Sequence, residues 1–144
     1  MYKQAVDGIR VLLVHPGGPF WSKRDLGAWS IPKGEYTDDE QPEAAARREF
    51  AEELGIELQH ALRPLGAVRQ KGGKLVVAFA AEGDFDVAAL RSNMFEVEWP
   101  PRSGRRQAFP EIDRAEWLAL PAAQQKIIAG QRPLLDRLEA ILTP

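Results

Sequence analysis

Residues 34–56 read GEYTDDEQPEAAARREFAEELGI and hold the densest group of acidic residues in the chain. Eight of the 21 Asp and Glu residues of the 144-residue protein lie in this stretch. Three of them, Glu49, Glu52 and Glu53, are spaced i, i+3 and i+4, which places their carboxylates on one face of a helix. Like charges on one face repel each other, so the pattern predicts a cation between them. A hard divalent cation with oxygen ligands is the natural candidate.

The residues around these acids predict where the helix begins and ends. Pro42 is favoured in a first helical turn, and Gly55 is typical of a C-terminal stop. Ala46, Phe50 and Leu54 recur at i, i+4 and i+8. This repeat predicts a buried helix face beside the acidic one.

Outside this helix, short apolar runs alternate with turns along the chain. We expect strands over residues 9–14, 28–31, 62–69, 75–81, 94–99 and 112–118, and helices over 121–128 and 134–142. Residues 70–74, QKGGK, predict a hairpin turn, and 100–106, PPRSGRR, predict a loop. With no internal repeat or linker, the economical interpretation is one α+β domain over residues 1–144.

Charge and composition restrict the class of partner. A formal net charge of -2 and a pI near 5.7 indicate no general attraction to nucleic acid or to an anionic membrane. A polyanion must therefore be bound locally, through a metal or a small basic cluster. The absence of cysteine excludes disulfides and fits a reducing compartment. The apolar run of residues 11–14 is too short for a signal peptide or a membrane span, so we expect a cytoplasmic enzyme or binding domain.

Read at fixed spacing, residues 34–56 resemble the Nudix box, G-x5-E-x7-R-E-U-x-E-E-x-G-U, in which U is a bulky apolar residue. Every defined position of the box is matched, by Gly34, Glu40, Arg48, Glu49, Phe50, Glu52, Glu53, Gly55 and Ile56. The resemblance implies the Nudix fold, an α/β/α sandwich in which helices flank a mixed β-sheet. It also implies a MutT-like hydrolase.

The activity that the resemblance implies is hydrolysis of a nucleoside diphosphate linked to another moiety, with Mg²⁺ or Mn²⁺ as cofactor. Such ions neutralise phosphate oxygens, orient the scissile bond and lower the pKa of a bound water. Mg²⁺ prefers carboxylate and water oxygens. The implied metal ligands are Glu49, Glu52 and Glu53, with the backbone carbonyl of Lys33 as a further ligand by analogy with the family.

The other box residues and one later acid also have implied roles. Arg48 lies four residues before Glu52 and can hold that carboxylate in place for catalysis, whereas Glu40 is expected to be a structural pairing residue. Glu111, six residues before Trp117, is the expected metal ligand from a later loop. The alternatives to Glu111 are Glu96, Glu98 and Glu116. The general base is left open among Glu52, Glu53 and Glu111.

Substrate contacts are expected from cationic and aromatic side chains in the flanking loops. Guanidinium groups suit phosphate oxygens, and an indole suits stacking on a base. The candidates are Trp29, Lys33, Lys74, Arg102, Arg105 and Arg106. The alternative for the cations is plain solvent exposure, and for Trp29 it is a place in the core. Neither histidine, His15 or His60, has a spacing that predicts a partner.

The residues before the box bear on the substrate. Residues 29–34, WSIPKG, are similar to the W-x-x-P-K-G approach in diadenosine polyphosphate and diphosphoinositol hydrolases, which favours a dinucleoside polyphosphate. The tyrosine that many diadenosine polyphosphate hydrolases carry after the box is absent. A nucleoside triphosphate pyrophosphohydrolase and a Nudix-shaped nucleotide-binding module without turnover therefore remain alternatives. The acidic pI does not favour an RNA 5′ end as substrate, and the oligomeric state is not predicted.

Overall fold

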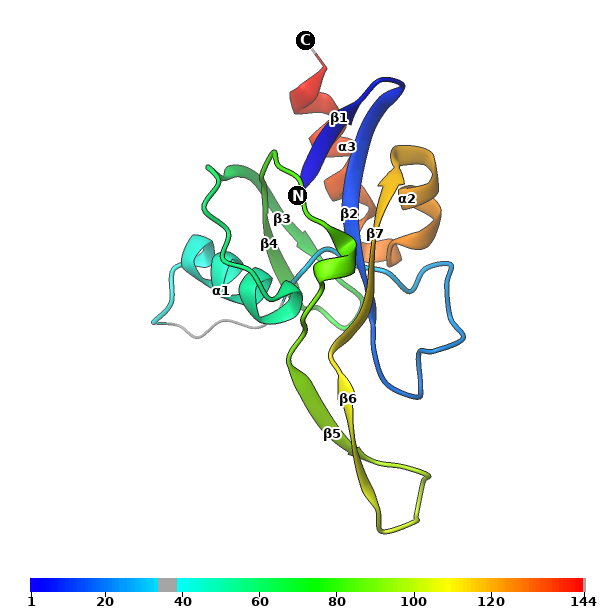
Figure 1. Ribbon diagram of the computed structural model, residues 1–144. Helices are drawn as coiled ribbons and strands as arrows, with labels where there is room; N and C mark the ends of the chain where they lie inside the picture. Colours follow the sequence, from blue (N-terminus) through cyan, green and yellow to red (C-terminus); the bar gives the residue numbers. More distant parts are fainter. Residues whose placement is uncertain (34–38, 144) are drawn as a thin grey trace.

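The computed structural model describes residues 1–33 and 39–143 (Figure 1). The strands are β1 (Tyr2–Ala5), β2 (Gly8–Pro16), β3 (Arg63–Arg69), β4 (Leu75–Ala80), β5 (Met94–Glu98), β6 (Arg106–Pro110) and β7 (Ile112–Ala119). The α-helices are α1 (Pro42–Leu54), α2 (Leu120–Lys126) and α3 (Arg132–Leu142), and two 3₁₀ turns cover Val87–Ala89 and Ala129–Gln131. In the described part of the chain, no helix has the length and apolar character needed to cross a bilayer.

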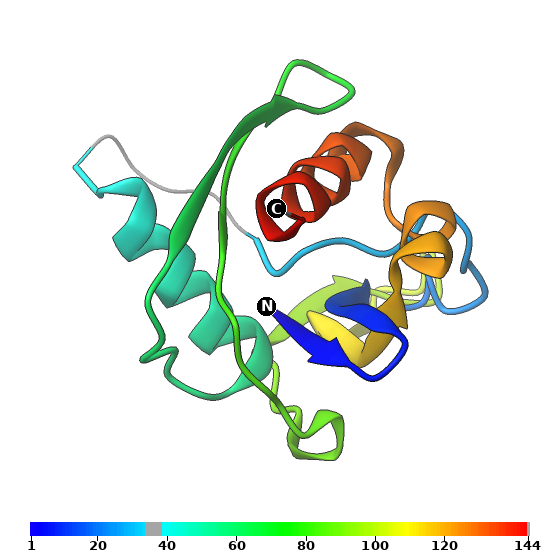
Figure 2. The ribbon, with the colours of Figure 1, turned by 90° about the horizontal axis from the view of Figure 1, so that it is seen from above.

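The strands of the described residues form three antiparallel sheets, in the orders β1-β2-β7, β3-β4 and β5-β6. Isolated bridges join further segments to them: a parallel bridge from Tyr2 to Glu82, an antiparallel one from Val14 to Ser30 and a parallel one from Trp29 to Ile127. The predicted mixed arrangement of strands with flanking helices is confirmed. Figure 2 shows α1 and α3 on opposite sides of the β3-β4 hairpin.

Strand β2 is the centre of the core, because both of its faces are covered. Val11 and Leu13 pack in one apolar cluster with residues of α2 and α3, whereas Leu12 and Val14 pack in another with Phe50 of α1. Successive side chains of a strand point to opposite faces, so a strand that is buried on both sides has a continuous apolar sequence. The run VLLV therefore places β2 between the helices.

Some predicted elements need correction. Residues 28–31 make isolated bridges and are not part of a named strand. Strand β6 begins at Arg106, inside the predicted loop, and its register with β5 runs from Met94↔Pro110 to Glu98↔Arg106. Strand β1 was not predicted either. Both strands contain polar residues, and their pairing partners, rather than their own apolar periodicity, hold them extended.

Candidate active site

Helix α1 carries the box acids, and its ends are set as the sequence predicts. It begins at Pro42 and ends before Gly55, whose φ of 85° is left-handed and whose N–H donates to the Ala51 carbonyl at 2.8 Å. Phe50 and Leu54 are buried. The buried face is turned slightly from the predicted one, since Ala45 rather than Ala46 is fully covered. The box glycine, Gly34, lies outside the described residues.

Arg48 joins three of the acids. Its Nε and Nη2 donate to the two carboxylate oxygens of Glu40 at 2.8 and 3.0 Å. Its Nη1 donates to Oε1 of Glu49 at 2.8 Å and to Oε2 of Glu52 at 3.2 Å. The hydrogen bonds to Glu40 first, then those to Glu52 and Glu49, raise the pKa of Arg48 above its ordinary value. The predicted contacts of Arg48 with Glu52 and of Glu40 with a pairing partner are both present.

Glu53 differs from the other acids of α1 because it is buried, with 8% of its surface exposed. Burial raises the pKa of Glu53 to about 8, although the backbone N–H of Lys33 donates to its Oε2 at 3.2 Å and opposes the shift. The charges of Glu49 and Glu111 raise the pKa further. The contact with Lys33 brings residue 33, whose carbonyl is a predicted ligand, beside the box acids.

A series of backbone hydrogen bonds brings Glu111 to the same place. The Asn93 N–H donates to the Glu52 carbonyl at 3.0 Å, and the Glu111 N–H donates to the Asn93 carbonyl at 2.8 Å. The Gly17 N–H in turn donates to the Glu111 carbonyl at 2.8 Å. Partial burial, and then the charges of Glu49 and Glu52, raise the pKa of Glu111. Glu111 therefore lies within electrostatic reach of the box acids, at the base of the β5-β6 hairpin.

The alternative acids have other partners. Glu96 lies 3.5 Å from Nε of Arg106 on the β5-β6 hairpin, and Glu116 lies 3.9 Å from Nζ of Lys126. Neither is among the charges that shift the pKa of Glu53 or Glu111. The same is true of Glu98. The structure thus favours Glu111 as the acid from the later loop.

Trp29 does not lie where the sequence interpretation placed it. Its side chain is fully buried at 0% exposure, and its Nε1–H donates to Oδ1 of Asp25 at 2.8 Å. The ring of His15 packs edge-on against it at a centroid distance of 5.1 Å. A ring enclosed in this way has no open face for a base, so the expected stacking role is corrected to a place in the core.

The predicted substrate-binding cations are spread over several loops. Lys33 adjoins Glu53, as described above, and Lys74 is exposed at the turn of the β3-β4 hairpin. Arg102 and Arg105 lie in the loop that joins β5 to β6, next to Arg106. Figure 1 shows this hairpin projecting from the body with that loop at its far end. Lys33 contacts a box acid through its backbone N–H, which donates to Glu53.

A cavity of about 100 Å³ lies beside the acids, between α1 and β4. Lys33 and Glu49 line it together with apolar residues that include Phe50, Leu62 and Val77. The cavity therefore places an apolar wall next to charged groups, which is the usual composition of a small-molecule site. Sequence spacing gave no sign of it, because its walls come from segments far apart in the chain, which are Met1 and residues 31–33, 42–50, 58–62 and 77–81.

The chemistry of the acids fits a hard divalent cation, since the donor set consists of carboxylate oxygens and one backbone carbonyl. Within residues 1–33 and 39–143, no group of three or more acidic or histidine side chains is already arranged to hold an ion. The contacts of Arg48 explain this arrangement, because its Nη1 lies between the carboxylates of Glu49 and Glu52. Arg48 therefore sets the positions from which Glu49 and Glu52 would approach a metal.

The family model of the NUDIX domain matches residues 5–138. The chain belongs to the Nudix family. It is a Nudix hydrolase, an enzyme of the pyrophosphohydrolase type, with the α+β fold that its box predicts. Nudix enzymes generally use a divalent metal such as Mg²⁺, in keeping with the acidic donor set.

Solved structures share this Nudix fold. The Ap4A hydrolase of C. elegans, in a binary complex, is 23% identical with a TM-score of 0.66, over 98% of this chain and 92% of that one. A MutT protein from Methanosarcina mazei Go1 is 20% identical with a TM-score of 0.63, over 99% and 91%. The NUDIX domain of Shewanella oneidensis NrtR, complexed with ADP ribose, is 18% identical with a TM-score of 0.62, over 99% and 83%. At these identities the likeness shows the fold alone. No curated protein matches the chain.

Proposed function

We propose that this Nudix hydrolase cleaves a phosphoanhydride bond in a nucleoside diphosphate-linked substrate by attack of water, with Mg²⁺ or Mn²⁺ as cofactor. The observation that carries the proposal is the approach of Glu111 to the acids of α1. Glu49 raises the pKa of both Glu53 and Glu111, and Glu52 raises that of Glu111. Carboxylates that raise one another's pKa in this way bind a dication favourably, because its charge removes their repulsion.

The residues have distinct tasks in this proposal. The carboxylates of Glu49, Glu52, Glu53 and Glu111 would hold the metal with the Lys33 carbonyl, and Arg48 keeps Glu49 and Glu52 oriented through its Nη1. When bound, the metal would neutralise the charge of the phosphates and lower the pKa of a bound water. The general base is one of Glu52, Glu53 and Glu111. Glu52, with 39% of its side chain exposed, is the most accessible box acid for a water molecule.

The proposed substrate is a dinucleoside polyphosphate. The WSIPKG approach to the box supports it, and so does the fold shared with an Ap4A hydrolase. Arg102, Arg105 and Arg106 at the far end of the β5-β6 hairpin are proposed to bind the distal phosphates of a long substrate, with Lys74 as a further contact. The cavity beside Glu49 is proposed to hold the nearer nucleoside. A cytoplasmic location remains a prediction.

The alternative is a nucleoside triphosphate pyrophosphohydrolase. The cavity of about 100 Å³ favours it, because a nucleoside triphosphate needs one nucleoside site whereas a dinucleoside polyphosphate carries two nucleosides. In that case the hairpin arginines have no phosphate to bind. Their substitution by alanine then leaves the KM unchanged.

A panel of dinucleoside polyphosphates and nucleoside triphosphates, incubated with Mg²⁺ in ¹⁸O-labelled water and scored by product mass, tests the proposal. We expect ¹⁸O in one of two phosphate-containing products, with a dinucleoside polyphosphate cleaved most efficiently. Preference for triphosphates selects the alternative. Cleavage of neither class contradicts both substrates, and nucleotide binding without any turnover would indicate a binding module.

A further inference from the structure

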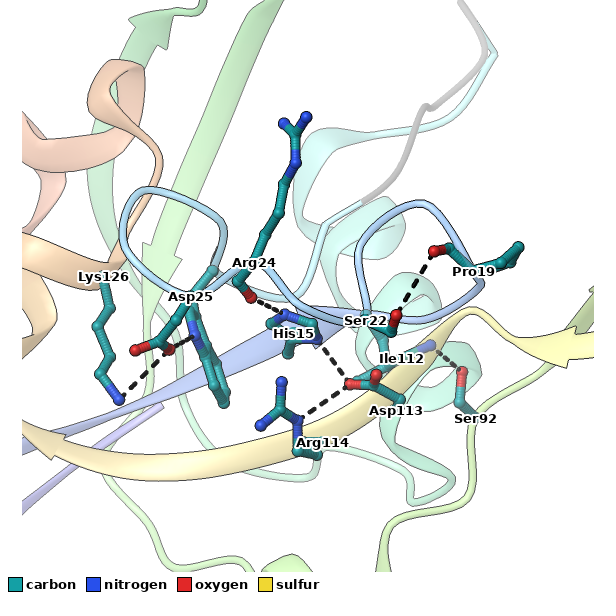
Figure 3. Close-up of polar contacts among 11 residues, drawn as sticks. His15, Pro19, Ser22, Arg24, Asp25, Ser92, Ile112, Asp113, Arg114 and Lys126 are labelled. Carbon is teal, nitrogen blue, oxygen red and sulfur yellow. Dashed lines mark hydrogen bonds and ion pairs between the residues drawn. The ribbon is translucent and has the colours of Figure 1, made fainter.

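His15, at the end of β2, is fully buried and has a partner at each ring nitrogen (Figure 3). Its Nδ1 lies 2.8 Å from Oδ1 of Asp113, and its Nε2 lies 2.6 Å from the backbone carbonyl oxygen of Arg24. A carbonyl oxygen only accepts, and the Asp113 carboxylate also faces Nε of Arg114 at 3.5 Å as an acceptor. Both contacts are satisfied when each ring nitrogen carries a proton, which is the imidazolium form.

The charged groups around this ring come from three elements. Asp113 and Arg114 lie on β7, Arg24 and Asp25 lie in residues 17–27, and Lys126 ends α2. Figure 3 shows the carbonyl of Arg24 directed at His15 and its guanidinium directed away. Asp25 pairs with Lys126 at 3.5 Å and accepts from Trp29, so Asp113 is the carboxylate that faces the ring itself. An imidazolium is therefore balanced by a neighbouring negative charge.

His15 and Gly17, two residues later in the chain, hold residues on both sides of Ile112. The His15 ring holds Asp113, and the Gly17 N–H donates to the Glu111 carbonyl at 2.8 Å. The approach at Gly17 is close, since a Cβ there would lie 1.9 Å from the Pro110 carbonyl oxygen. The end of β2 therefore fixes residues 110–113, and with them the backbone of Glu111.

We propose that His15 is a positioning residue of the enzyme. Through its two ring nitrogens it fastens Asp113 and residues 17–27 to the end of β2, and so fixes Glu111 against the box acids. This inference rests on the proposed role of Glu111 as a metal ligand. Groups that orient metal ligands typically change metal affinity or activity by about 10- to 100-fold when they are removed.

The two contacts of the His15 ring are tested by ¹⁵N NMR of the imidazole rings. The chain has two histidines, so the spectrum holds two ring systems, and His60→Gln assigns them. We expect a ring N–H of His15 that exchanges slowly with solvent, because the ring is buried and hydrogen-bonded. Exchange as fast as that of the exposed His60 ring contradicts the two contacts.

The positioning role is tested by Mn²⁺ affinity, measured by calorimetry on four proteins: wild type, His15→Gln, Glu111→Gln and the double variant. We expect His15→Gln to weaken binding about 10-fold in the wild-type background and to have no further effect once Glu111 is replaced. An equal loss in both backgrounds means that His15 does not act through Glu111 and overturns the proposal.

The controls separate folding from positioning. His60→Gln, which changes the exposed histidine, should leave Mn²⁺ affinity unchanged. If His15→Gln does not fold, Asp113→Asn replaces it in the same cycle with the same expected result. Wild-type protein that binds no Mn²⁺ contradicts the proposed function and the positioning role together, whereas the NMR experiment still decides whether the His15 ring is held at its two nitrogens.

Discussion

At the scale of single residues, Glu53 is the box acid whose ionised form is most disfavoured by burial. The helical spacing of the sequence placed it on one acidic face with Glu49 and Glu52. The structure buries it instead, because the chain at Lys33 packs against it and donates a backbone hydrogen bond. Such a tertiary contact cannot be read from periodicity. The contact of Arg48 with Glu52 could be predicted, since it follows from i, i+4 spacing within α1.

The pKa of Glu53 gives the first prediction. Its folded value of about 8 exceeds the ordinary value of 4.5, so between these two pH values the unfolded chain is ionised while the folded one holds a proton. Proton binding by Glu53 therefore contributes to the free energy of unfolding. This contribution is fully present below pH 4.5 and is lost as the pH rises through 8, at about 1.4 kcal/mol per pH unit between these two values. The free energy of unfolding of the wild type, measured by denaturant titration in the presence of EDTA at several pH values, should fall with this slope. Glu53→Gln should lack it, and parallel curves for the two proteins would rule the shift out.

Arg48 gives the second prediction. Arg48→Lys keeps the charge but loses the fork that binds both oxygens of Glu40 while Nη1 contacts Glu49 and Glu52. We expect kcat with Mg²⁺ to fall by about tenfold or more, in line with the effect of other groups that orient ligands. Arg47→Lys, at the neighbouring arginine that pairs with Glu43, is the matched control. Equal kcat values for the two variants would argue against an orienting role for Arg48.

At the scale of elements, the site is assembled by backbone hydrogen bonds between segments distant in the sequence. The series from Glu52 through Asn93 and Glu111 to Gly17 connects α1, the base of the β5-β6 hairpin and the end of β2. Backbone groups carry no residue-specific signal, so Asn93 and Gly17 could not be recognised from the sequence. Glu111 could be proposed only through the family resemblance.

Gly17 gives the third prediction. An added Cβ at Gly17 would lie 1.9 Å from the Pro110 carbonyl oxygen. Gly17→Ala must therefore displace the backbone at Pro110, the residue that precedes Glu111. We expect a loss of about 1–3 kcal/mol in the free energy of unfolding, together with weaker Mn²⁺ binding. Gly72→Ala is the control, because its Cβ would meet nothing within 4 Å although its φ is +91°. Unaltered Mn²⁺ affinity in Gly17→Ala would show that the position of Glu111 does not depend on this contact.

At the scale of the whole molecule, the box predicts the fold through the family that it identifies, whose model matches residues 5–138. The VLLV run of β2, the β3-β4 hairpin and the two C-terminal helices could all be predicted from apolar periodicity. Strands β1 and β6 could not be predicted, because pairing with neighbouring strands, rather than their own apolar periodicity, keeps them extended. In the proposed function, the substrate is selected by the cavity beside Glu49 and by the hairpin arginines, which no single motif encodes.

The central claim is that the acids of α1 perform the hydrolysis, and turnover of Glu52→Gln tests it most directly. The kcat of wild type, Glu52→Gln and Glu43→Gln is measured with Mg²⁺ on the best substrate of the panel, beside thermal unfolding of each protein. Glu43 is the matched control, because it lies on the same helix and pairs with Arg47 away from the site. We predict that Glu52→Gln loses about 100-fold or more in kcat while remaining folded, and that Glu43→Gln keeps wild-type turnover. Wild-type turnover in folded Glu52→Gln would contradict the account.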